Sequence, residues 1–194
     1  AGADRTQAAL VAIDEALSAL GAVVRRMDFP YRLAGRRAPD RLPVLVAAVA
    51  AEAAGLGRSS DRLLLGGRSM GGRVCSVAVA EGADLGPAPV AGLALVSYPL
   101  HPPGRPDRRR DAHLPDLHVP CLFVSGTRDA FGSVEELEAA TALIPAPVRH
   151  HWIPGGDHGL RRRDAEVAEV VARWAAEPAP GGPGLPPGRA GHRG

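Results

Sequence analysis

Cysteine, aromatic residues, long apolar runs and an excess of either charge are all scarce or absent in this sequence. Its 194 residues include 2 cysteines, and aromatic residues make up 4%. Apolar runs stay below the ~18 consecutive residues of a membrane-spanning helix, so we expect no membrane partner. The 23 basic residues nearly balance the 21 acidic ones, which argues against a nucleic-acid partner.

The few cysteines and the histidines do not form a recognisable metal-binding pattern. Cys75 and Cys121 fall in a predicted helix and a predicted strand, so we expect buried apolar residues and not a disulfide or a metal pair. His101, His113 and His118 share one loop but lack a ligand motif. We therefore expect a protein that binds no metal and no cofactor. We also expect it to be located in the reducing cytoplasm. Nothing in the sequence indicates the oligomeric state.

The remaining composition is that of one globular domain followed by a tail. Hydrophobic residues make up 45% and charged residues 23% of the chain. Residues 178–194 are different, because five Pro and six Gly occupy 17 positions. Such a segment has too few apolar groups to offset the entropy of ordering it. We expect a domain over 1–177 and a disordered tail over 178–194.

Apolar periodicity predicts strands that alternate with helices. Helical spacing occurs over 6–19, 43–55, 74–78, 133–144 and 164–174. Strand patterns occur over 22–29, 63–65, 90–98, 121–125 and 148–153. Ser133 and Glu136 form a capping box, and Asp164 is expected to cap the last helix. This alternation predicts a parallel sheet covered on both faces, with ligands bound beyond the carboxyl ends of its strands.

A G-x-S-x-G motif lies between the strand at 63–65 and the helix that follows. Gly67, Ser69 and Gly71 have the spacing of a nucleophile elbow, in which a strained turn lifts the serine oxygen clear of the sheet. The following helix directs its positive end toward that oxygen. The bland alternative is a serine in a glycine-rich loop, but both flanking elements are where the motif requires them.

Partners for this serine are expected just after later strands. Asp129 follows the strand at 121–125, and His158 follows the strand at 148–153. Their order after Ser69 is that of the hydrolases with such an elbow. A neutral imidazole can take the serine proton, and a carboxylate can fix its tautomer. We therefore predict Ser69, Asp129 and His158 as catalytic residues.

Alternatives exist for two of these roles. His150 and His151 could be the base, but they lie inside the strand pattern and not beyond its end. Asp157 is adjacent to His158 and would have to fold back onto it. The backbone N–H of Met70 is the natural first donor of an oxyanion hole.

Five stretches together resemble a known family. They are FPYRLAGRRAPD from residue 29, GGRSMGGR from 66, SYPLHPPG from 97, FVSGTRDAFG from 123 and GGDH from 155. They resemble the alpha/beta-hydrolase family that groups dienelactone-hydrolase-like bacterial proteins with testis-expressed proteins and members of a histone-acetyltransferase (NSL) complex. The resemblance implies a three-layer alpha/beta-hydrolase fold with a mostly parallel sheet over residues 1–177.

The resemblance also implies a function. A serine hydrolase that cleaves a small ester or related acyl substrate is expected, with the predicted residues in the triad positions. Because some relatives are subunits of larger assemblies, the alternative is a non-catalytic interaction module on a hydrolase scaffold.

The start of the sequence affects this expectation. In the fold it resembles, the helix at 6–19 follows a strand and a His-Gly loop that supplies the second oxyanion donor. This sequence begins inside that loop, so we expect a truncated hydrolase that lacks the N-terminal strands. The alternative is that the strands at 22–29 and 62–66 pair directly. In either case we expect an oxyanion hole that is incomplete or depends on Ala1 and Gly2, and weak activity.

Overall fold

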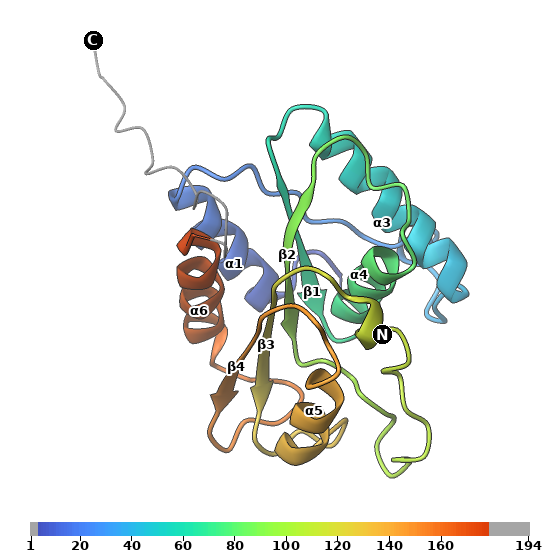
Figure 1. Cartoon of the computed structure of the whole chain (residues 1–194), viewed down its shortest axis with the longest axis vertical. Helices are drawn as coiled ribbons and strands as arrows, with labels where there is room; N and C mark the ends of the chain where they lie inside the picture. Colours follow the sequence, from blue (N-terminus) through green and yellow to red (C-terminus); the bar gives the residue numbers. More distant parts are fainter. Residues whose placement is uncertain (1–3, 179–194) are drawn as a thin grey trace.

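A sheet of four parallel strands forms the centre of the structure (Figure 1). The structure is a computed structural model that describes residues 4–178. The strands are β1 (Leu63–Arg68), β2 (Val90–Val96), β3 (Cys121–Gly126) and β4 (Val148–Ile153), and they lie side by side in this order. Because all four run the same way, their carboxyl ends meet at one edge of the sheet.

Helices cover both faces of this sheet, as the alternation in sequence predicts. Helices α1 (Ala8–Ala19) and α6 (Asp164–Ala176) lie together on one face, and α3 (Leu42–Gly57) and α4 (Met70–Ala80) cover the other (Figure 1). The short α5 (Val134–Thr141) packs on the same side as α3 and α4. The turn α2 (Pro30–Leu33) begins at a proline, whose fixed φ suits a first helical position. The predicted three-layer α/β fold is confirmed.

Alternating side chains of the strands supply one core on each face. On the α3 and α4 side, Leu93, Leu95 and Phe123 are buried. Their neighbours Val96 and Val124 point the other way, into the core beneath α1 and α6. A strand with covered faces on both sides reads as a continuous apolar run, which is why β2 and β3 were identifiable from the sequence.

The predicted strand at 22–29 is wrong, because this segment is not paired with any strand of the described residues. It is extended, and its side chains contact both the N-terminal part of the chain and α3. Arg26 donates to Asp14 at 2.8 Å, Asp28 accepts from the Arg5 N–H at 2.8 Å, and Arg25 lies 4.0 Å from Glu52. Val23 is 76% exposed. Direct pairing of 22–29 with β1 is likewise not found.

Helix ends follow the predictions only in part. At α5 the capping box is present, since Ser133 Oγ accepts from the Glu136 N–H and Glu136 accepts from the Ser133 N–H. At α6 the N-cap residue is Arg163 and not Asp164. Asp164 instead lies in the first turn, where its negative charge interacts favourably with the positive end of the helix dipole.

Both cysteines are buried and unbonded to one another, as expected. Burial raises the pKa of the Cys75 and Cys121 thiols to about 12, so both are neutral at physiological pH. No helix among residues 4–178 is long and apolar enough to cross a membrane. Ala1, Gly2 and the predicted tail beyond Pro178 lie outside the described residues.

Candidate active site

Ser69 occupies a sharp turn between a strand and a helix. Strand β1 ends at Arg68 and α4 begins at Met70, so Ser69 alone connects them. Its φ of 51° and ψ of −121° lie outside the regions that L-residues ordinarily adopt. The Ser69 N–H donates to the carbonyl of Val96 in β2 at 2.8 Å, which fixes the turn to the sheet. Such strain at a serine between a strand and a helix is typical of a nucleophile elbow.

Small residues make this turn possible, although not the pair that the motif suggests. A Cβ on Gly72 would lie 2.6 Å from the carbonyl oxygen of Gly67, so the helix start and the strand end touch through their backbones. A Cβ on Gly71 would meet nothing within 4 Å. Gly67 and Gly72 therefore provide the close approach, and the space beside Gly71 is open.

Asp129 and His158 lie at the same edge of the sheet, in the loops after β3 and β4. His158 Nε2 is 2.8 Å from Ser69 Oγ, and His158 Nδ1 is 2.8 Å from one Asp129 oxygen and 3.1 Å from the other. With its Nδ1–H donated to the carboxylate, the ring has Nε2 free to accept the serine proton. The structure thus brings together the three residues predicted from the sequence.

The carboxylate is more deeply buried than the imidazole. The Asp129 side chain is 3% exposed and that of His158 is 22% exposed. Asp129 also accepts a hydrogen bond from the Phe131 N–H at 2.8 Å. This bond fixes the position of the carboxylate and stabilises its negative charge. This arrangement can hold the ring in one tautomer and stabilise an imidazolium when one forms.

The first turn of α4 offers a donor near the serine. Met70 is the first residue of the helix, so its N–H has no acceptor within the helix. No other described residue accepts from it. The predicted second donors, Ala1 and Gly2, lie outside the described residues.

Backbone contacts join the aspartate loop to the histidine loop. The Arg128 N–H donates to the carbonyl of Gly156 at 2.8 Å, and the Gly155 N–H donates to Thr127 Oγ1 at 2.9 Å. Gly126 and Gly156 are so close that a Cβ on Gly126 would lie 2.2 Å from the Gly156 carbonyl oxygen. The loops that carry Asp129 and His158 are therefore held in direct contact with each other.

Two further residues contact His158 and were missed by the sequence analysis. Phe131 stacks on the imidazole, with 3.9 Å between ring centroids and 26° between planes. Arg68 donates from Nη2 to the His158 carbonyl oxygen at 2.6 Å. The one signal available was their position, Arg68 inside the G-x-S-x-G motif and Phe131 two residues after Asp129.

The alternative residues have other partners. His150 is 2.9 Å from Thr141 Oγ1 and stacks on Phe123 and Trp152 in the core. His151 lies 3.3 Å from Glu166 of α6. Asp157 is exposed and accepts the N–H of Gly159. None of the three is hydrogen-bonded to Ser69 in the part of the chain described.

Two of the three loop histidines have protein partners. His101 lies 3.2 Å from Glu136, and His113 lies 2.7 Å from Ser76 Oγ. Among residues 4–178 there is no group of three His, Cys, Asp or Glu side chains arranged to hold a metal ion.

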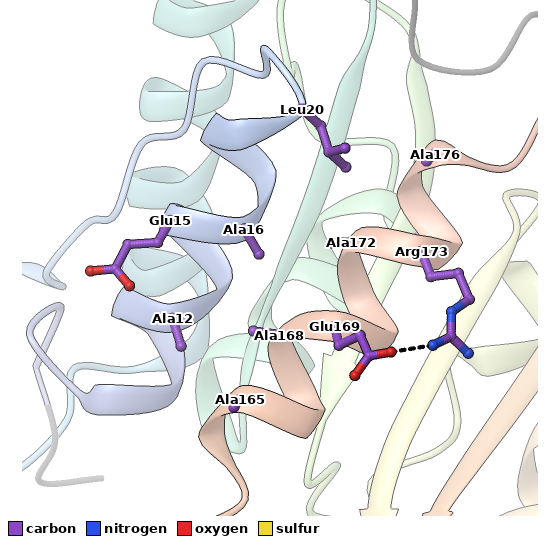
Figure 2. Close-up of a pocket in the computed structure, with 10 residues that line it drawn as sticks. All are labelled: Ala12, Glu15, Ala16, Leu20, Ala165, Ala168, Glu169, Ala172, Arg173 and Ala176. Atoms are coloured by element: carbon purple, nitrogen blue, oxygen red, sulfur yellow. Dashed lines mark hydrogen bonds and ion pairs between the residues drawn. The ribbon is translucent and has the colours of Figure 1, made fainter. Parts of the chain in front are cut away.

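One hollow in the described surface lies away from Ser69. It is an open groove of about 650 Å³ between α1 and α6, lined mainly by alanines (Figure 2). Glu15 and Arg173 turn away from it, and Arg173 pairs with Glu169 on the same helix (Figure 2). The groove contains no residue of the predicted triad.

Comparisons with known proteins agree with this architecture. A family model described as "Alpha/beta hydrolase domain" matches residues 1–177. An alpha-beta serine hydrolase homologue from Coxiella burnetii aligns with a TM-score of 0.67 at 20% identity, over 90% of this chain and 79% of that one. Dienelactone hydrolase from Anabaena variabilis aligns with a TM-score of 0.69 at 20% identity, over 89% of this chain and 80% of that one. Est1E from Butyrivibrio proteoclasticus aligns with a TM-score of 0.69 at 17% identity, over 89% of this chain and 82% of that one.

Proposed function

The chain belongs to the alpha/beta hydrolase domain family, and from that premise we propose that it is a serine hydrolase that cleaves a small ester or related acyl substrate. The observation that carries the proposal is the continuous set of contacts from Ser69 Oγ through the two nitrogens of His158 to Asp129. The quoted motifs further lead us to propose the dienelactone-hydrolase-like branch of the family. Two buried free thiols suit a reducing cytoplasm.

The first half of the proposed reaction forms an acyl-enzyme. Ser69 Oγ attacks the acyl carbon while its proton passes to His158 Nε2, and the carbonyl oxygen becomes an oxyanion. The N–H of Met70 stabilises this oxyanion. When the tetrahedral intermediate collapses, the bond to the leaving alkoxide breaks and His158 returns the proton to it. The products are an alcohol and an ester on Ser69.

The second half releases the acid. Water attacks the acyl carbon and gives a proton to His158 Nε2, and the new tetrahedral intermediate then expels Ser69, which recovers that proton. Asp129 keeps the tautomer correct in both halves. Its burial and its bond to Phe131 support this role because the carboxylate has no freedom to leave the ring.

The proposal is tested by labelling and turnover in matched serine variants. We expect a fluorophosphonate probe to label the wild type and Ser59→Ala, which alters an exposed serine, and to leave Ser69→Ala unlabelled. Hydrolysis of p-nitrophenyl acetate should fall about 10⁴-fold or more in Ser69→Ala. Asp129→Asn should lose about 10⁴-fold through the wrong tautomer.

Two outcomes would reject this function. A folded Ser69→Ala that hydrolyses the ester at the wild-type rate would show that another group is the nucleophile. A wild type that is neither labelled nor active would favour the non-catalytic interaction module.

A further inference from the structure

Arg68 is the variable residue between the first glycine and the serine of the motif, and it is also the last residue of β1. We propose that it is a positioning residue that holds the histidine loop against the nucleophile elbow, so that Ser69 and His158 stay within hydrogen-bond distance. The inference rests on the proposed function, because it assigns to Arg68 the geometry of that same site.

The contact that carries this inference joins residues 90 positions apart. Arg68 Nη2 donates to the backbone carbonyl of His158 at 2.6 Å. A guanidinium that donates to a carbonyl forms a charge-assisted bond, which is stronger than the neutral kind. The bond is made to the backbone of His158 and not to its ring. It therefore fixes the position of the His158 backbone and leaves both ring nitrogens free to bond Ser69 and Asp129.

This contact is needed because the elbow has few other connections to the histidine loop. Among the described residues, hydrogen bonds between 68–70 and 154–163 are limited to the Arg68 bond and the Ser69–His158 bond itself. The aspartate loop, by contrast, is joined to the histidine loop through backbone bonds and the contact of Gly126 with Gly156. Without Arg68, the Ser69–His158 bond would be the one direct hydrogen bond between the elbow and the histidine loop among the described residues.

The charges around Arg68 keep its side chain in place. Asp129, Asp157 and Asp164, from the two loops and the start of α6, all favour its charged form. Burial lowers the pKa of Arg68 and the three carboxylates oppose this effect. A guanidinium stays protonated under such conditions, and its planar donors hold a fixed direction. One half-buried cation at the end of β1 thus interacts favourably with carboxylates of three segments and is hydrogen-bonded to one of these segments, the histidine loop.

A positioning role has a kinetic signature distinct from that of substrate binding. A displacement of about 1 Å in a reacting group can cost about 10²-fold in rate. Because the Arg68 contact is made to the protein, its loss should lower kcat and leave KM within about twofold.

The experiment compares Arg68→Lys, Arg68→Gln and Arg68→Met with Arg161→Met, which removes an exposed arginine of the same loop as His158. Each kcat is divided by the fraction of Ser69 labelled by fluorophosphonate at completion, and melting temperature is measured for each protein. We expect a loss of about 10²-fold in kcat per labelled site for Arg68→Met, a smaller loss for Arg68→Gln, and kcat within about tenfold of wild type for Arg68→Lys. Arg161→Met should match the wild type.

Each outcome decides between alternatives. Equal kcat per labelled site in Arg68→Met and wild type would overturn the inference while the hydrolase function stands. A change confined to KM would instead assign Arg68 to substrate binding and would overturn it as well. If Arg68→Met does not fold, the comparison of Arg68→Lys with Arg68→Gln decides. Equal kcat per labelled site in these two variants rejects the charge-assisted contact, and a higher kcat in Arg68→Lys supports it. A wild type without labelling rejects the proposed function itself.

Discussion

His158 is held by four different contacts. Asp129 accepts its Nδ1–H, Ser69 lies at Nε2, Arg68 donates to its backbone carbonyl, and Phe131 covers one face of the ring. The Arg68 contact would remain if the ring turned about its Cβ–Cγ bond. The hydrogen bonds to Asp129 and Ser69 and the stacked ring of Phe131 therefore restrict this rotation.

We predict that Phe131→Ala lowers kcat by about tenfold, since stacked aromatic pairs contribute about 0.5 to 1.5 kcal/mol beyond their buried area. The π face also favours the cation that forms on His158 as the serine attacks. Phe131→Tyr retains the ring and should keep kcat near that of the wild type. Steady-state hydrolysis of p-nitrophenyl acetate measures both, and an Ala variant as fast as the wild type would contradict this role.

The sequence predicts the three residues of the proposed triad but not the residues that contact them. Ser69, Asp129 and His158 each follow a predicted strand, so the parallel sheet alone places them at one edge. Arg68 contacts a backbone atom 90 residues away, and the carbonyl it binds is chemically the same at every residue. No local pattern distinguishes that partner. Phe131 could equally have been a core residue.

At the scale of elements, the site depends on how closely the turns after β3 and β4 approach. A side chain on Gly126 would be forced into the backbone of Gly156, which cannot rotate away. We expect Gly126→Ala to lower the free energy of unfolding by about 1 to 3 kcal/mol, as overpacking does. It should also lower kcat, because it separates Asp129 from His158.

Gly55→Ala is the matched control for this variant. Gly55 lies within α3, and a Cβ there meets nothing within 4 Å. Alanine is the better helix former by about 1 kcal/mol, so this change should stabilise the protein and leave kcat unaltered. Urea unfolding and hydrolysis rates measure both variants. A Gly126→Ala protein as stable and active as the wild type would show that the two turns can separate at no cost.

The sequence predicts a strand correctly where burial of its side chains sets the apolar pattern. It does not predict whether a segment finds a neighbouring strand to pair with. Both faces of β2 and β3 are covered, so their apolar runs are unambiguous. The segment 22–29 has strand-like composition, but a strand also needs a neighbour to receive its N–H and C=O groups. A single segment's sequence does not contain that information. The helix ends depend on φ and ψ at one residue, which is why Arg163 and not Asp164 is the N-cap of α6.

At the scale of the whole molecule, the long loop between β2 and β3 is fixed to α4 by a partly buried histidine. His113 lies 2.7 Å from Ser76 Oγ. Burial lowers the pKa of His113 from 6.5 to about 4, with a further decrease from the nearby Arg73, while Asp111 and Asp116 oppose it. The folded protein therefore holds this ring neutral at a pH where the unfolded chain protonates it.

This difference predicts a loss of stability in acid. Between about pH 6.5 and 4 the unfolded state binds the extra proton, so the free energy of unfolding falls as the pH falls through this range. One such group contributes at most about 1.4 kcal/mol per pH unit, and less here because the ring keeps some contact with water. Urea unfolding at several pH values should show a weaker pH dependence in His113→Gln than in the wild type. His118→Gln, in the same loop but exposed, should retain the wild-type slope; equal slopes in all three would contradict the assignment.

The order of the strands along the chain has a consequence for the protein during its synthesis. His158 is 89 residues beyond Ser69, and β3 and β4 must both join the sheet before the two meet. Parallel strands need these long crossovers, so the contacts of the site are among the least local in the fold. A ribosome-bound chain therefore carries the serine for some time without its base. On the proposed mechanism, the growing polypeptide cannot hydrolyse an ester until the last crossover has closed.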